Sequence, residues 1–265
     1  MPRSEIPVDI LLNILEYVDQ GGLATMCRVN KICCYFSQDF LYRDIFVGDP
    51  RVHRTLAQSI HLARKVRLFC SYSTGTDSNL AMALRNMTSL RILQLSSTFN
   101  PDILDGCTFK LELFECSYLN SHGESFPKFL SSQPSLKYLT LSGHFMFTLW
   151  SLEATCLPNL TYINVATSWL PYLIPGRPLN EVIVDGGIPD DDTFDFSIFA
   201  LSTTPIKKLM IDHSCLQPTP LHFLASFLPS LTYFTLTFWK HRSDYIIEMV
   251  CRLSYINYWR LSNIA

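Results

Sequence analysis

The densest cluster of carboxylates in the sequence is the run Asp190-Asp191-Asp192, which is followed by Asp195. Carboxylate oxygens bind divalent cations, and a calcium loop spaces them at alternate positions around a glycine and ends in a glutamate. This run lacks that spacing, and it comes directly after the turn-forming sequence Gly-Gly-Ile-Pro. We therefore expect a solvated loop here and no metal site.

Cysteine and histidine offer no better-defined centre. The nine cysteines are scattered, Cys33 and Cys34 are adjacent, and no two are separated by two residues, as in zinc sites. His144, His213 and His241 lie in or just after expected strands, without a partner that the spacing identifies. The motifs of serine hydrolases, phosphate-binding loops, dinucleotide folds and zinc proteases are absent from the sequence. We expect reduced thiols, no catalytic residue, no metal, no cofactor and no enzymatic activity.

The composition indicates a folded protein without a nucleic-acid or membrane partner. Of the 265 residues, 48% are hydrophobic and 17% are charged, and the formal net charge is −2. Clustered basic residues, which nucleic-acid binding needs, are limited to Lys-His-Arg at 240–242. No uncharged apolar run reaches the roughly 18 residues of a membrane span, and Glu5 and Asp9 interrupt any signal-peptide core. We expect an intracellular protein, cytoplasmic or nuclear.

Self-similar phrases run through most of the chain. "SLRILQL" at 89–95, "SLKYLTL" at 135–141, "NLTYINV" at 159–165 and "SLTYFTL" at 230–236 share the pattern apolar-x-x-apolar-x-apolar. We find nine copies, whose first anchors lie 18 to 28 residues apart. The spacing matches the leucine-rich repeat, in which strands alternate with helical segments and stacked units share one core. The first anchors are Ala63, Leu90, Thr108, Leu136, Leu160, Leu179, Ile206, Leu231 and Ile256.

The segments between these strands have helical spacing. Apolar residues recur every three or four positions at 80–87, 126–132, 221–227 and 245–253. Several segments end shortly before a proline, which disfavours helix at the preceding residue and so begins the strand. The expected fold class is α/β, with an irregular leucine-rich-repeat solenoid over 63–265 whose curved parallel sheet carries helices on its convex side. The prolines are Pro134, Pro158, Pro205 and Pro229.

Residues 1–46 lack the repeat pattern and predict a short all-α unit, which 47–62 should connect to the repeats. Pro7 suits a helix start, and Gly21-Gly22 should separate the first helix from the second. A unit of about 45 residues is near the lower limit for independent folding. The expected helices span about 8–18, 23–30 and 31–46, the last broken near Ser37.

The first of these helices carries more apolar surface than its own unit needs. On a helical wheel its polar residues fall on one narrow stripe, whereas an ordinary surface helix has an apolar stripe about 100° wide. One apolar face should hold the unit together and seat it on the first repeat, and the opposite face should contact another protein. The face toward the unit consists of Leu11, Leu15 and Val18, and the opposite face consists of Ile10, Ile14 and Tyr17.

The order of residue types in this unit resembles the F-box. The F-box pattern opens with an apolar residue and proline, then an acidic residue and apolar pairs, and closes with leucine and an aromatic residue. "LYRDIF", followed by "HLARKVRLF", is especially similar to fungal F-box proteins. The usual tryptophans near Phe36 and at Tyr42 are missing, and Gly21-Gly22 replaces the usual acidic turn. The matching residues are Ile6, Pro7, Asp9, Ile10, Leu11, Ile14, Leu15, Leu23, Cys27, Arg28, Phe36, Leu41 and Tyr42.

This resemblance implies a function in ubiquitin transfer. In the family, the F-box binds the Skp adaptor of a cullin–RING ubiquitin ligase, the repeats bind a protein substrate, and other subunits transfer ubiquitin. The chain would then be the substrate-recognition subunit of an SCF-type E3 ligase. An alternative is a repeat scaffold that binds a partner without a ligase. The implied adaptor-facing residues are Pro7, Ile10, Leu11, Ile14 and Leu15, to which the helical wheel adds Tyr17. For Leu11 and Leu15, packing in the core is an equally good interpretation.

The strand positions between and just after the anchors should line the concave face of the repeats. Tyrosine recurs at one such position in four copies, and tyrosine and arginine are enriched in binding hot spots, although tyrosine also favours strands. In the first and third copies the same rule places Lys65, Arg67, Phe69, Lys110, Glu112 and Phe114 on this face. The candidate substrate-binding residues are Tyr138, Tyr162, Tyr233, Tyr258 and Arg260.

The sequence given ends at "YWRLSNIA", a few residues after the ninth strand phrase. Stacked repeats usually end in a unit with a polar outer face. We expect Trp259 and Leu261 to lie on an uncovered end, so that either this is a shortened member of its family or a partner covers the end.

Overall fold

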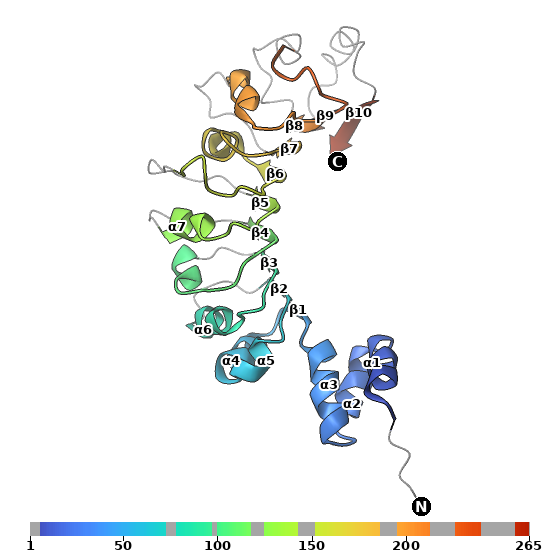
Figure 1. The fold of residues 1–265 in the computed structure, drawn as a ribbon. Helices are drawn as coiled ribbons and strands as arrows, with labels where there is room; N and C mark the ends of the chain where they lie inside the picture. The colour runs from blue at the N-terminus through green and yellow to red at the C-terminus, as the bar shows by residue number, and fades with distance from the viewer. Residues whose placement is uncertain are drawn as a thin grey trace, which may run out of the picture.

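The computed structural model describes residues 6–72, 78–96, 100–117, 125–142, 152–185, 195–212, 226–239 and 258–264. Three helices are followed by a sheet of ten parallel strands, whose order in space is their order in the sequence. The sheet bends into an arc with helical segments along its outer side (Figure 1). The predicted α/β class with a parallel sheet is confirmed. We call residues 6–41 the head, and the sheet face turned away from the helical segments the inner face.

The strands are short and keep one register across the sheet. In that register, Leu93 is the partner of Phe69 on one side and of Phe114 on the other. Successive side chains point to opposite faces of a strand, so each strand buries alternate residues against the helical layer. The strands are β1 (Asp44–Val47), β2 (Leu68–Ser71), β3 (Ile92–Leu95), β4 (Leu113–Ser117), β5 (Tyr138–Ser142), β6 (Tyr162–Val165), β7 (Glu181–Val184), β8 (Lys208–Asp212), β9 (Tyr233–Trp239) and β10 (Tyr258–Ile264).

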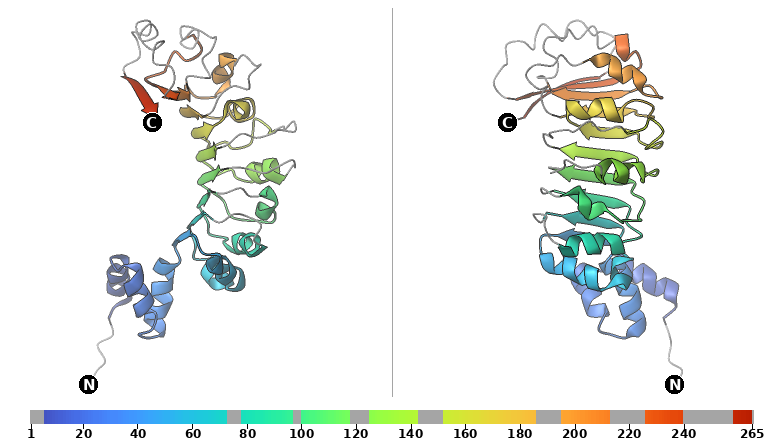
Figure 2. Two further views of the ribbon diagram at one scale, coloured as in Figure 1. Left: turned by 180° about the vertical axis from the view of Figure 1, so that it is seen from behind. Right: turned by 90° about the vertical axis from the view of Figure 1, so that its left-hand side faces the viewer.

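The helical segments between the strands are also short, and they form one layer on the outer side of the sheet (Figure 2). Proline occupies the first turn of three of them. Proline lacks a backbone N–H, and in the first turn this costs nothing because N–H groups there have no hydrogen-bond partner within the helix. No described helix is long and apolar enough to cross a membrane. These segments are α4 (Pro50–Gln58), α5 (Ile60–Ala63), α6 (Ser78–Asn86), η1 (Pro101–Leu104), α7 (Ser125–Ser131), η2 (Thr167–Trp169), α8 (Leu170–Leu173) and η3 (Phe196–Leu201).

A continuous hydrophobic core runs between the sheet and the helical layer, from Ile45 to Leu236. Its centre is aromatic: the Phe114 ring lies 5.6 Å from Phe129 and 6.0 Å from Phe126, measured between ring centroids. Burial of one such side chain contributes about 1.5–3 kcal/mol, and edge-to-face ring pairs contribute about 0.5–1.5 kcal/mol more. Because each unit supplies only a few of these side chains, the units are stable only when stacked.

Six of the nine expected anchors are buried at the register position that the pattern gave them: Leu90, Leu136, Leu160, Leu179, Ile206 and Leu231. Ala63 is also buried, but in α5. The first and third copies are wrong by three residues. The strand register makes Val66 and Leu111 the anchors instead of Ala63 and Thr108. Phe69 and Phe114, expected on the exposed face, are fully buried. Both stretches carry apolar residues three apart, so the same pattern fits at two positions, and burial of the larger phenylalanine side chains decides between them. The ninth anchor, Ile256, lies outside the described residues.

The sheet begins earlier than the sequence suggested. Residues 44–46 were expected in the third helix of the head, but α3 ends at Leu41 and Asp44–Val47 is the first strand, with Ile45 and Val47 buried. The segment 47–62, expected as a connection, contains α4 and α5 on the outer side, and α4 lies against α6. The first unit of the stack therefore lies within these residues.

The head consists of α1 (Val8–Glu16), α2 (Gln20–Met26) and α3 (Lys31–Leu41). Asp19 begins α2 by accepting a 2.8 Å hydrogen bond from the Gly22 amide, so the glycine pair lies inside α2 and does not separate the helices. A Cβ on Gly22 would clash with a Val18 methyl carbon, so a larger residue here would force the Val18 side chain to move. The expected break near Ser37 is also wrong, because α3 is continuous and buries Ser37.

Candidate partner-binding surfaces

The first helix of the head has one buried and one exposed apolar face. Leu11 and Leu15 are buried in a small core of their own with Leu23 and Cys33, and Val18 packs against it. These two leucines were candidates for adaptor contact, but in this structure their side chains are not accessible to a partner.

The opposite face of α1 is open. Ile10 is 51% exposed, Ile14 is 46% exposed and Tyr17 is 88% exposed. Pro7 is also exposed, and its carbonyl accepts the Leu11 amide at 3.1 Å at the start of the helix. The structure therefore separates the six candidate residues into four surface positions and two core positions.

Further exposed apolar side chains of the head lie at and before the start of α3. Val29, Ile32 and Tyr35 are each about 60% exposed, whereas Cys33 is buried and Phe36 is half-buried. These three were not predicted as contact residues from the sequence. The signal was present in the three-residue spacing of Ile32 and Tyr35, which puts them on the helix face away from Cys33. The head thus exposes apolar side chains on two of its helices.

The inner face of the sheet brings two of the predicted tyrosines together. Tyr138 of β5 and Tyr162 of β6 are register partners with ring centroids 6.0 Å apart, and Tyr138 is 46% exposed. Tyr233 is in the same row but is separated from Tyr162 by the partners Glu181 and Lys208, whose charged groups lie 3.1 Å apart. The four predicted tyrosines therefore do not form one continuous row.

The last two predicted substrate-binding residues, Tyr258 and Arg260, lie on β10. In register they face Tyr233 and Thr235 of β9. For β10 the structure describes the backbone, and the side chains of both residues lie outside what it describes, as do those of Trp259 and Leu261.

Two carboxylates act on the Tyr162 side chain. Burial raises the pKa of Tyr162, and the negative charges of Glu181 and Glu115 raise it further. One carboxylate oxygen of Glu115 accepts a 2.9 Å hydrogen bond from the Gln94 amide group. Glu115 was not predicted from the sequence, because the third repeat copy was placed three residues too early and put Glu112 on this face instead. Aromatic rings next to carboxylates can bind a cationic side chain through the ring face and through charge pairing.

Glu112 instead lies just before β4, where it pairs with two cations. Its oxygens lie 2.7 Å from a guanidinium nitrogen of Arg91 and 3.4 Å from the ammonium of Lys137. The hydrogen bonds from Arg91 and then Lys137 lower the pKa of Glu112. The two cations share one carboxylate, so this cluster at the edge of the sheet keeps one surplus positive charge. No general acid or base is formed here.

No group of three or more potential metal ligands occurs within the described part of the chain. Asp195 accepts hydrogen bonds from the amide and hydroxyl of Ser197 at the start of η3, and these bonds lower its pKa. Its role is to cap that helix. The rest of the acidic run, Asp190–Asp192, and the three candidate histidines lie outside the described residues.

The cysteines that the structure describes are all free thiols. Burial raises the pKa of Cys107 to about 12 and raises that of Cys116 well above its usual value. A thiol with a raised pKa stays protonated and is a poor nucleophile. These side chains therefore serve packing.

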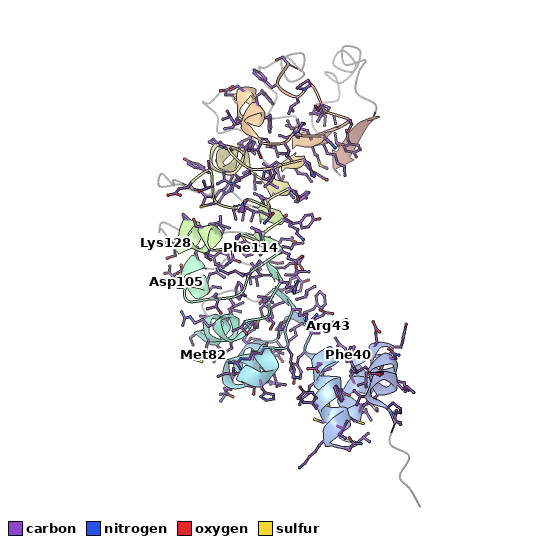
Figure 3. All side chains as sticks on the ribbon, viewed as in Figure 1. Phe40, Arg43, Met82, Asp105, Phe114 and Lys128 are labelled. Carbon is purple, nitrogen blue, oxygen red and sulfur yellow. The ribbon has the colours of Figure 1, made fainter. Side chains whose placement is uncertain are left out.

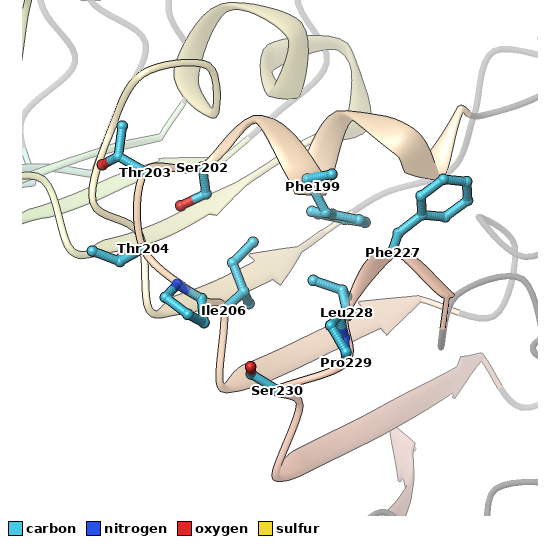
Figure 4. Close-up of a pocket in the computed structure, with 11 residues that line it drawn as sticks. Phe199, Ser202, Thr203, Thr204, Ile206, Phe227, Leu228, Pro229 and Ser230 are labelled. Atoms are coloured by element: carbon cyan, nitrogen blue, oxygen red, sulfur yellow. The ribbon is translucent and has the colours of Figure 1, made fainter.

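A hollow of about 320 Å³ lies between η3 and the turn before β9 (Figure 4). Its walls are apolar side chains, prolines and small hydroxyl residues, among them Phe199, Thr203, Ile206, Phe227 and Ser230. None of the described lining residues is charged, so the hollow has no group that could carry acid–base chemistry.

The sequence matches no known protein-family model, and it has no significant match among curated proteins.

Proposed function

We propose that the chain is the substrate-recognition subunit of an SCF-type E3 ubiquitin ligase. In this proposal the head is an F-box that binds the Skp adaptor and through it a cullin, and the sheet is a leucine-rich-repeat solenoid that binds a protein substrate on its inner face. The chain itself performs no catalysis, since other subunits transfer ubiquitin.

The observation that carries the proposal is the concentration of exposed apolar side chains on the head. Among the described residues, eight of the fourteen exposed large hydrophobic side chains belong to residues 6–41. Single exposed hydrophobic residues are ordinary, but a cluster on one small unit is typical of a protein interaction surface. Ile10, Ile14 and Tyr17 are the positions where the F-box resemblance and the helical wheel place adaptor contact.

The inner face of the sheet supports the second half of the proposal. The described helical segments lie along the outer side of the sheet (Figure 1), and on the inner face the carboxylates of Glu181 and Glu115 act electrostatically on Tyr162. Tyrosine provides a large rigid contact area with few rotatable bonds, which suits a binding hot spot. A substrate segment with cationic side chains would complement this site in charge.

A paired substitution tests adaptor binding. Ile10→Asp with Ile14→Asp places two charges on the exposed face of α1, so the head should stay folded while affinity for purified Skp adaptor falls about 100-fold or more. Ile60→Asp is the matched control, because Ile60 is 50% exposed but belongs to α5 outside the head. It should bind the adaptor as the unchanged chain does. Equal binding by the paired variant would contradict the assignment, and failure of the unchanged chain to bind would favour a repeat scaffold that acts without a ligase.

A further inference from the structure

The junction between the head and the sheet carries an excess of positive charge. A hollow of about 390 Å³ lies there, with walls from both units. Figure 3 labels Phe40 and Arg43 where α3 meets the first strands. Four cationic side chains line the hollow, and Asp39 is the single carboxylate among its described lining residues. The residues that matter here are Asp39, Phe40, Arg43, Arg64, Lys65 and Arg67.

Three arginines are stacked at this edge of the sheet. Arg43, Arg67 and Arg91 each stand directly before a strand, and those strands are in register. The backbone confirms that the three are neighbours, since the Arg67 amide donates to the Arg43 carbonyl at 2.8 Å and the Arg91 amide donates to the Arg67 carbonyl at 2.9 Å. Adjacent strands lie about 4.8 Å apart, and like charges in directly opposite positions repel.

The outer arginines of this stack have carboxylate partners, but among the described residues the central one does not. Arg43 and Arg91 each have a carboxylate partner, and Lys65 both pairs with Asp39 and lies 4.7 Å above the ring of Tyr35. Among the described residues, neither Arg64 nor Arg67 has a carboxylate within ion-pair distance. The ion pairs of the outer arginines are Arg43–Asp44 at 3.0 Å and Arg91–Glu112 at 2.7 Å.

We propose that this hollow binds a phosphoryl group, either free in solution or carried on a side chain of another protein. A guanidinium group donates two parallel hydrogen bonds to a phosphate, and a phosphoryl dianion can accept from Arg64 and Arg67 together. Its two negative charges compensate the surplus better than one carboxylate would. The repulsion along the arginine stack falls when the site is filled.

The position of the hollow gives such binding a structural consequence. Asp39 and Phe40 come from α3 of the head, whereas Arg64 stands at the end of α5 and Arg67 directly before β2. A phosphoryl group bound between them contacts both units and stabilises their present arrangement. This binding is independent of adaptor recognition, which uses the other side chains of α1.

Isothermal titration calorimetry of the full chain with inorganic phosphate, at constant ionic strength, tests the site. Arg67→Gln should lower the affinity about tenfold, with Arg64→Gln as a second variant. Lys207→Gln is the matched control, because Lys207 is an exposed cation directly before β8, in the same register position as Arg67. It should change the affinity by less than about twofold, as loss of an unpaired surface charge does.

Thermal unfolding supplies a second readout. In phosphate-free buffer of low ionic strength, Arg67→Gln should unfold at or above the temperature of the unchanged chain, because it removes repulsion. With phosphate the order should reverse. A phosphoserine peptide that binds more tightly than inorganic phosphate, and needs Arg67, would identify a phosphorylated protein as the ligand, and equal binding would identify the free anion. Absence of binding heat, or equal losses in Arg67→Gln and Lys207→Gln, would overturn the proposal.

Discussion

Replacing Phe114 with alanine should lower the free energy of unfolding by about 3–5 kcal/mol, the usual cost for a buried phenylalanine. Its side chain is fully buried and lies between the strands and the helical layer (Figure 3). It contacts the rings of Phe126 and Phe129, so the substitution leaves a cavity and removes two aromatic pairs. Urea unfolding followed by circular dichroism would register this as a midpoint lowered by about 1–2 M, for an m-value of about 2–3 kcal/mol/M.

The neighbouring residue on the same strand provides the control. Leu113 is half-buried and points to the inner face, so Leu113→Ala should cost about 1 kcal/mol or less. A larger loss of stability in Leu113→Ala than in Phe114→Ala would contradict this burial of Phe114. That result would mean that the third unit has the register expected from the sequence alone, with Phe114 on the exposed face.

Three further predictions concern the inner face, a buried cation and a buried thiol. Tyr138→Ala with Tyr162→Ala should abolish substrate capture and leave the melting temperature nearly unchanged; a fall as large as that of a core variant would contradict a binding role. Arg177→Ala should lower the free energy of unfolding in urea by about 2–4 kcal/mol, because the buried guanidinium donates to the carbonyls of Pro175 and Glu153 at 2.8 and 3.0 Å. An unchanged free energy of unfolding would show that these two hydrogen bonds do not stabilise the fold. The raised pKa of Cys107 means that the unfolded chain releases its proton first as pH rises, so stability present below pH 9 is lost progressively toward pH 12. Cys107→Ala should reduce that alkaline loss in unfolding curves recorded on either side of pH 9, and an unchanged loss would exclude Cys107 as its source.

The repeating strand units could be predicted because their physical signal is redundant. Leu90, Leu136 and Leu160 recur with the same alternation and with polar residues between them, so one register buries every large side chain. The two faces of α1 were predictable for the same reason, because a helical wheel separates Leu11 and Leu15 from the opposite face.

The errors arose where the local signal was ambiguous. "ARKVRLF" and "TFKLELF" fit the repeat pattern at two positions, and only pairing with neighbouring strands decides for Phe69 and Phe114. The first strand, Asp44–Val47, is short and follows a helix closely, so its alternation of buried and exposed residues is too brief to be recognised in the sequence. The start of α2 was not predicted, because the glycine pair suggested a break between helices. In the structure the Asp19 side chain accepts a hydrogen bond from the Gly22 amide, and such a bond begins a helix.

The proposed function depends first on whether the head binds the Skp adaptor. Isothermal titration calorimetry of the unchanged chain against purified adaptor tests it most directly. We expect a complex of one chain with one adaptor and a dissociation constant of about 1 µM or lower, as an apolar interface of ordinary size gives. Absence of binding at adaptor concentrations far above that value, with the chain folded, would contradict it.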